Sequence, residues 1–101
     1  MRRVLPNRRP CETFGFVSQG QVYSASVAFF DDGGLAEVFL TNGKAGSDSD
    51  AAARDSAVTC SIALQFGTPM DVIRRALLRD PQGAPSSPLG VALDMIDAWG
   101  T

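Results

Sequence analysis

Three short runs of apolar residues, spaced as in β-strands, occupy the first half of the chain. They cover residues 12–19, 21–30 and 35–42, and turn signals at Gly20 and at residues 31–34 (Asp-Asp-Gly-Gly) separate them. Alternating patterns rich in Val, Phe, Tyr and Thr are typical of strands, and short Gly-containing turns join neighbouring strands as hairpins. The pattern predicts a three-stranded antiparallel meander.

Helical spacing replaces this pattern after residue 46. Ser47 and the acidic residues that follow it are typical of a helix start, and apolar residues then recur at every fourth position. The spacing predicts a helix over about 49 to 66 whose stripe of Val58, Ile62 and Phe66 packs on the sheet, flanked by Ala57, Ser61 and Leu64. Gly67 is the predicted stop.

Two shorter helices are predicted in the remaining third. Thr68 followed by Pro69 is typical of a helix start, and residues 80–83 (Asp-Pro-Gln-Gly) predict the end of that helix. Ser87 followed by Pro88 repeats the same signal for the last helix. Strands that all precede helices favour an α+β fold, here a three-stranded antiparallel meander followed by three helices packed on one face.

Charge divides the 101-residue chain into two parts. The first ten residues hold four arginines and no acid, whereas the remainder holds five basic and eleven acidic residues, for a net charge of −2 overall. We expect residues 1–10 to form an extended basic arm and residues 11–99 to form one domain. Only the arm would attract phosphate or nucleic acid. Its arginines are Arg2, Arg3, Arg8 and Arg9.

Catalytic, metal and cofactor sites are not predicted. The chain has no histidine, and its two cysteines, Cys11 and Cys60, are far apart and form no metal-binding or redox motif. Ser86 and Ser87 lack a neighbouring base, so a helix cap explains Ser87 better than a nucleophile does. No apolar run is long enough to span a membrane and no signal peptide is recognisable, so a cytoplasmic location is expected.

A glycine-containing loop is the first candidate binding site. Gly43, Lys44 and Gly46 lead into the N-terminus of the long helix, where glycine backbone N–H groups and a lysine would suit an anion. Turn chemistry alone also explains these glycines and is the favoured interpretation. The acids Asp48 and Asp50 weaken the anion hypothesis.

Glu37 and Arg54 are the second candidate. Glu37 lies in an apolar strand and Arg54 in the first turns of the long helix. They would either pair across the sheet–helix interface or line a polar pocket that binds a ligand. A purely structural ion pair, or a solvated position for each residue, is the favoured interpretation. Together with the loop, these residues form the predicted ligand-binding set.

Several short motifs, in a fixed order, resemble the TSCPD domain that accompanies adenosylcobalamin-dependent ribonucleotide reductases. The resemblance covers residues 8 to 98. It rests on Arg9-Pro10, Asp32-Gly33-Gly34, Glu37-Val38-Phe39, Gly43-Lys44-Ala45-Gly46, Arg54, Gly67 and Pro85-Ser86-Ser87-Pro88. The stretch that names the family is only partly matched, because Ser87 replaces its cysteine and Leu89 its aspartate. No metal or redox role is therefore carried over.

The resemblance implies a stand-alone accessory module in deoxynucleotide metabolism, with a ribonucleotide reductase chain or a nucleotide as its partner. The alternative is a nucleic-acid-binding protein that uses the arginine arm, although the acidic body opposes it. A small oligomeric enzyme is the third hypothesis, and the lack of histidine makes it the weakest. A homo-oligomer is expected in any case, because a three-stranded sheet has edge strands to cover.

Overall fold

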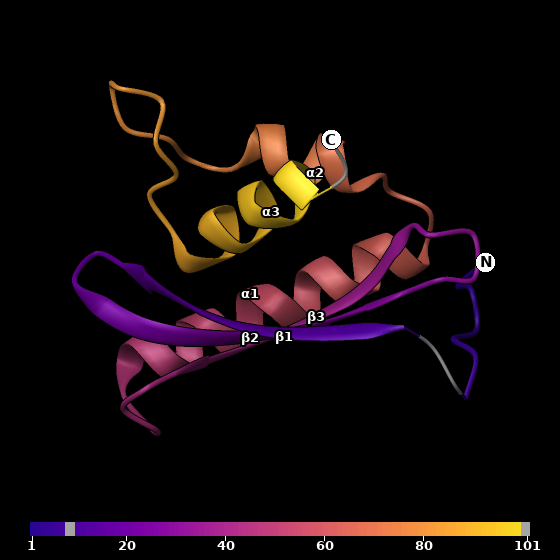
Figure 1. Cartoon of the computed structure of the whole chain (residues 1–101), viewed down its shortest axis with the longest axis horizontal. Helices are drawn as coiled ribbons and strands as arrows, with labels where there is room; N and C mark the ends of the chain where they lie inside the picture. Colours follow the sequence, from indigo (N-terminus) through magenta and orange to yellow (C-terminus); the bar gives the residue numbers. More distant parts are fainter. Residues whose placement is uncertain (8–9, 100–101) are drawn as a thin grey trace.

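A three-stranded antiparallel sheet followed by three helices forms the chain, in a computed structural model that describes residues 1–7 and 10–99 (Figure 1). The strands are β1 (Cys11–Ser18), β2 (Gln21–Phe29) and β3 (Leu35–Asn42), in the order β1-β2-β3. The helices are α1 (Asp48–Gln65), α2 (Met70–Ala76) and α3 (Pro88–Trp99). The predicted α+β meander and its helix order are confirmed.

The core lies on one face of the sheet. Alternate residues of the strands point toward the helices, so that Tyr23, Ala25 and Val27 of β2 meet Val38 and Leu40 of β3 and the buried sides of α1 and α3. The apolar side of α3 contributes Leu89, Ala92, Leu93 and Ile96. The other face of the sheet, with exposed Val17, Val22 and Phe39, is not covered by a helix (Figure 1).

Polar residues of α1 hold the outer edge of β3. Ser61 Oγ accepts a hydrogen bond from Val38 N at 2.8 Å and donates one to Val38 O at 3.0 Å. Gln65 Nε2 donates to Ala36 O, and Asp50 accepts from Asn42 N. An unpaired strand edge is a template for aggregation, and here side chains of a helix bond several of its outward groups.

This arrangement corrects the predicted orientation of α1. Val58, Ile62 and Phe66 are 50%, 41% and 58% exposed, so the apolar stripe does not pack on the sheet. The buried side instead carries mainly small and polar residues, with Leu64 as its one large apolar side chain. The buried residues are Asp50, Ala53, Ala57, Cys60, Ser61, Leu64 and Gln65. The flanking residues Ala57, Ser61 and Leu64 are buried as predicted, but the helix is rotated so that the centre of the stripe faces outward. The strand edge needs hydrogen-bonding groups, and Asp50, Ser61 and Gln65 supply them.

The remaining helix signals are confirmed in part. Gly67 follows α1 with a φ of 104°, a conformation that favours glycine, and Ser87 Oγ accepts from Gly90 N at the start of α3. The helix α2 begins at Met70 without a side-chain cap and ends at Ala76. It is shorter than predicted, because the chain is already extended at Leu77. Arg79 and Pro85 then form an isolated antiparallel β-bridge.

Candidate functional site

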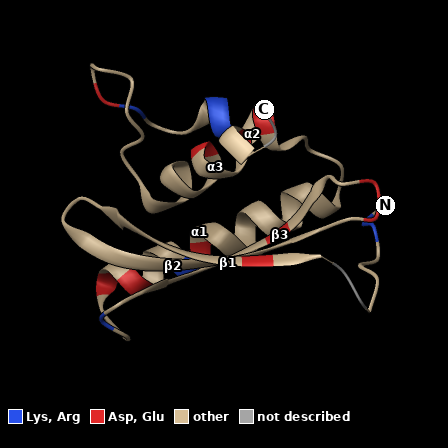
Figure 2. Cartoon of the chain, viewed as in Figure 1, with Lys and Arg blue, Asp and Glu red and all other residues tan. Residues whose placement is uncertain are grey.

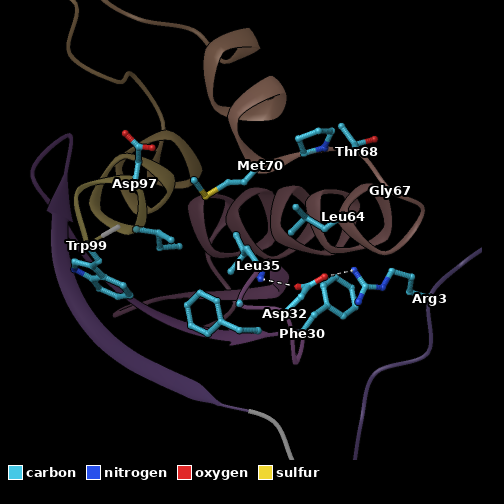
Figure 3. Close-up of a pocket in the computed structure, with 15 residues that line it drawn as sticks. Arg3, Phe30, Asp32, Leu35, Leu64, Gly67, Thr68, Met70, Asp97 and Trp99 are labelled. Atoms are coloured by element: carbon cyan, nitrogen blue, oxygen red, sulfur yellow. Dashed lines mark hydrogen bonds and ion pairs between the residues drawn. The ribbon is translucent and has the colours of Figure 1, made fainter. Parts of the chain in front are cut away.

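A cavity of about 630 Å³ opens at the end of the molecule where the β2–β3 turn meets the C-terminal end of α1 (Figure 3). Its floor consists of the buried side chains Phe30, Leu35, Leu64 and Ile96. The turn itself is fixed, because Asp32 Oδ1 accepts from Gly34 N at 2.9 Å. The size and the mainly apolar lining are those of a small-molecule site.

Charged and aromatic groups surround the mouth of this cavity. The guanidinium of Arg3 lies 3.6 Å from the centroid of the Phe30 ring, and its NH1 atom is 3.3 Å from Asp32 Oδ2. Trp99, 47% exposed, lies on another side, with Asp97 nearby (Figure 3). The site thus combines one cation, two carboxylates and flat aromatic surfaces around an apolar floor.

The segment before β1 is anchored at this site. Arg3 N donates to Gln65 O at 2.7 Å, and Arg2 Nε donates to Gln65 Oε1 at 2.7 Å. The first part of the predicted arm is therefore bonded to the body of the molecule, and the Arg2 guanidinium is occupied within the chain. Arg8 and Arg9 lie outside the described residues. Basic and acidic positions are scattered along the described chain, and they lie close together near the N-terminus, where Arg3 pairs with Asp32 (Figure 2).

Protonation of Asp32 is disfavoured by its surroundings. The backbone N–H of Gly34 is the main group that lowers the pKa of Asp32, and the charge of Arg3 acts in the same direction. The carboxylate is therefore ionised at neutral pH and accepts hydrogen bonds. It faces solvent with most of its surface, so its bond to Arg3 is a weak, exchangeable surface pair.

The predicted anion loop is filled from within the chain. Asp50 Oδ2 accepts from Gly46 N at 3.1 Å and from Arg54 Nε at 2.9 Å, while Asp50 Oδ1 accepts from Asn42 N. These backbone N–H groups hold a carboxylate of the chain itself. Lys44 is exposed, and Lys44 N donates to Asn42 Oδ1. Gly46 and Arg54 thus meet at Asp50, while Lys44 is bonded, among the described residues, only through its backbone, and turn and capping chemistry accounts for the loop geometry.

Glu37 is separated from this loop group. In the strand register it lies opposite Ala28, which in turn pairs with Cys11, on the sheet face away from the helices. Arg54 bonds to Asp50 on the helix side. The predicted Glu37–Arg54 pair is therefore not formed, because the two side chains are on opposite sides of the sheet.

A cluster of arginines and aspartates joins α2 to α3 and was missed by the sequence analysis. Arg79 binds Asp94 through two hydrogen bonds, of 2.6 and 2.9 Å, and Arg74 contacts Asp71, Asp94 and Asp97. Arg79 is the largest of the groups that lower the pKa of Asp94. The cluster fixes the end of α3, and with it Asp97 at the cavity rim. Its basic residues precede α3 and two of its acidic residues lie on α3, so no local motif signals it.

The described residues contain no group of acidic or cysteine side chains suited to a metal ion. No helix in the described part of the chain is long and apolar enough to cross a membrane. Comparison with protein-family models, curated proteins and solved structures gives no match for this chain. The cavity's own chemistry is therefore the basis for a functional proposal.

Proposed function

We propose that the protein is a non-catalytic binding module whose ligand is nucleotide-like, a planar base joined to an anionic phosphate, held in the cavity at the C-terminal end of α1. One observation carries the proposal. The guanidinium of Arg3 is stacked on Phe30 and paired with Asp32 at the mouth of an apolar cavity. A flat cation beside flat apolar surfaces suits a ligand with a π-face and a negative charge.

The existing Arg3–Asp32 pair supports exchange with such a ligand. Both side chains are at least half exposed, so replacing the carboxylate by a phosphate costs little in lost surface pairing. Arginine binds phosphate through two parallel N–H donors. Asp32, once released, is an ionised acceptor for sugar hydroxyls. Trp99 and Met70 give the base an aromatic and a polarisable surface.

The resemblance to the TSCPD domain supplies the metabolic context of the proposal, namely deoxynucleotide metabolism with a ribonucleotide reductase chain as partner. The order of the motifs in the sequence supports this context. Lys44 and Arg54 are exposed near the N-terminal end of α1, whereas the cavity is at its C-terminal end. The helix is about 27 Å long, and Arg54 in its second turn lies about 15 Å along the axis from Leu64 in the cavity lining. A protein partner at Lys44 and Arg54 would leave the cavity open.

Trp99 makes the ligand test direct, because it is the only tryptophan in the chain and lines the cavity. Purified protein at constant concentration is titrated with deoxynucleosides and deoxynucleotides while Trp99 fluorescence is followed. We expect saturable quenching, with deoxynucleotides tighter than deoxynucleosides. Arg3→Gln should weaken the binding of deoxynucleotides and leave the binding of deoxynucleosides nearly unchanged. Arg2→Gln is the matched control, since Arg2 bonds to Gln65 outside the cavity lining.

The partner test is separate. A purified adenosylcobalamin-dependent reductase chain is passed over the immobilised protein, with Lys44→Ala and Arg54→Ala as variants and Arg75→Ala as an exposed control on α2. Retention lost in the first two variants supports the accessory role. Failure to bind both the reductase and every nucleotide tested would overturn the proposed function.

A further inference from the structure

The two edge strands of the sheet differ in whether their outward backbone groups are hydrogen-bonded. The outer edge of β3 is bonded by Ser61, Gln65 and Asp50 of α1. The other edge is formed by β1, and α3 packs above β1 rather than beside it (Figure 1). Because β1 pairs only with β2 in the described sheet, half of its backbone N–H and C=O groups point away from the sheet.

The register of the strands shows which residues of β1 carry these outward groups. Gly43 N donates to Val22 O, so Val22 and the other even-numbered residues of β2 face β3. The odd-numbered residues of β2 face β1 and bond to their partners there, Phe14 and Phe16 among them. The N–H and C=O groups of Thr13, Gly15 and Val17 therefore point away from the sheet. Within residues 1–7 and 10–99, no backbone or side-chain hydrogen bond reaches these outward groups.

The sequence of β1 lacks the usual protection of an exposed edge. Residues 11–18 contain one charged residue, Glu12, and neither lysine nor proline. Gly15 lies in the middle of the strand, and a strand glycine often marks the close approach of another backbone. Beside the edge, on the helix side, Phe14 and Phe16 are half-buried, and Trp99 packs edge-on against Phe14 at 4.9 Å.

We propose that β1 pairs antiparallel with β1 of a second copy of this chain, about a two-fold axis at Gly15. The predicted homo-oligomer thereby acquires a specific interface, independent of the cavity ligand. In this register Thr13 lies opposite Val17 of the second copy and Phe14 opposite its Phe16. The outward groups then form about six backbone hydrogen bonds and complete a continuous six-stranded sheet.

A second copy fits this edge because the pairing is self-complementary. The two-fold axis repeats the same donors and acceptors on both sides, extends the row of aromatic side chains across the interface, and places Glu12 opposite Ser18, away from its own counterpart. One strand edge with three partly exposed aromatics makes a small interface, so we expect the dimer to be in reversible equilibrium with the monomer.

Two measurements on the full chain test the interface. Sedimentation equilibrium from micromolar to millimolar protein, without ligand, should show a monomer–dimer equilibrium. Hydrogen exchange by NMR should then show the Thr13, Gly15 and Val17 amides protected at high concentration and exchanging rapidly at low concentration. The Phe14 and Phe16 amides should be protected at both, because they bond to β2.

Variants separate the edge from the open sheet face. Gly15→Pro removes an outward donor without touching the β1–β2 bonds and should give a folded monomer by circular dichroism. Val22→Lys is the control, because Val22 is exposed on the open face but lies on the central strand, and this variant should still dimerise. If Gly15→Pro does not fold, the exchange pattern decides. A monomer at every concentration, or a dimer whose three outward amides stay unprotected, would overturn the proposal.

Discussion

Ser61 and Val38 are joined by two hydrogen bonds through a single hydroxyl, which accepts from the Val38 N–H at 2.8 Å and donates to its carbonyl at 3.0 Å. Both residues are buried, and Val38 has no exposed surface. One serine thus satisfies both outward backbone groups of an edge residue, and helix α1 closes this side of the sheet.

Removing that hydroxyl should be costly. Ser61→Ala leaves a buried N–H and a buried C=O without partners, and we expect the free energy of unfolding to fall by about 2–3 kcal/mol. Urea denaturation followed by circular dichroism measures it. Thr59→Ala is the control, because its hydroxyl bonds only to Asp55 O on the exposed side of α1. Equal losses in the two variants would contradict the structural role of Ser61.

Acid should weaken the loop before α1 through Asp50. The backbone N–H of Asn42, then that of Gly46 and then Arg54 lower the pKa of this carboxyl in the folded protein. A group whose pKa is lower in the folded state stabilises the fold above its unfolded pKa, and this contribution is lost as pH falls through the folded value, below about 4. We expect Asp50→Asn to lower the urea midpoint at pH 7 and to flatten the loss of stability in acid. An unchanged acid profile would contradict this assignment.

The pairing of Arg79 with Asp94 should hold the segment between α2 and α3. Two hydrogen bonds join them, and Arg79 NH1 also donates to Gly83 O. We expect Arg79→Gln and Asp94→Asn each to lower the Tm by a few degrees, and the double variant to lose less than the two losses added together. Thermal unfolding at low and high salt measures this. Strict additivity would mean that the pair contributes no coupling.

The two cysteines should differ in reactivity. Burial raises the pKa of the Cys60 thiol to about 11, so little thiolate forms at pH 8, whereas Cys11 is exposed. A thiol reagent should modify one cysteine rapidly in the native protein and the second only after urea is added. Cys11→Ser should abolish the rapid reaction. Rapid modification of Cys60 in native protein would mean that α1 separates easily from the core.

The sequence predicted the strands, the turns and most helix boundaries because each depends on local chemistry. The Asp-Asp-Gly-Gly turn, Gly67 and the Ser87 cap need no tertiary information. The buried side of α1 was not predictable in the same way. Asp50, Ser61 and Gln65 are buried because they form hydrogen bonds with backbone groups of β3, and local sequence does not show that pairing.

The candidate site was beyond sequence reasoning for a related reason. Its lining runs from Arg3 to Trp99, and only the folded chain brings these residues together. The loop containing Lys44 was visible in the sequence, but the carboxylate of Asp50 that fills it was interpreted as a weakness of the anion hypothesis rather than as the occupant. The sequence predicted an extended arm whose arginines are available to phosphate, whereas Arg2 and Arg3 form hydrogen bonds to Gln65 and Asp32 of the domain.

The central claim is that the cavity, and not the loop before α1, holds a nucleotide-like ligand. An NMR titration of isotope-labelled protein with dATP tests it most directly, at a fixed protein concentration. We expect concentration-dependent shifts of the Trp99 indole N–H and of the Gly33, Gly34 and Gly67 amides that line the cavity, with the Gly43 and Gly46 amides unmoved. Shifts confined to Gly43 and Gly46, or no shifts at millimolar dATP, would contradict the account.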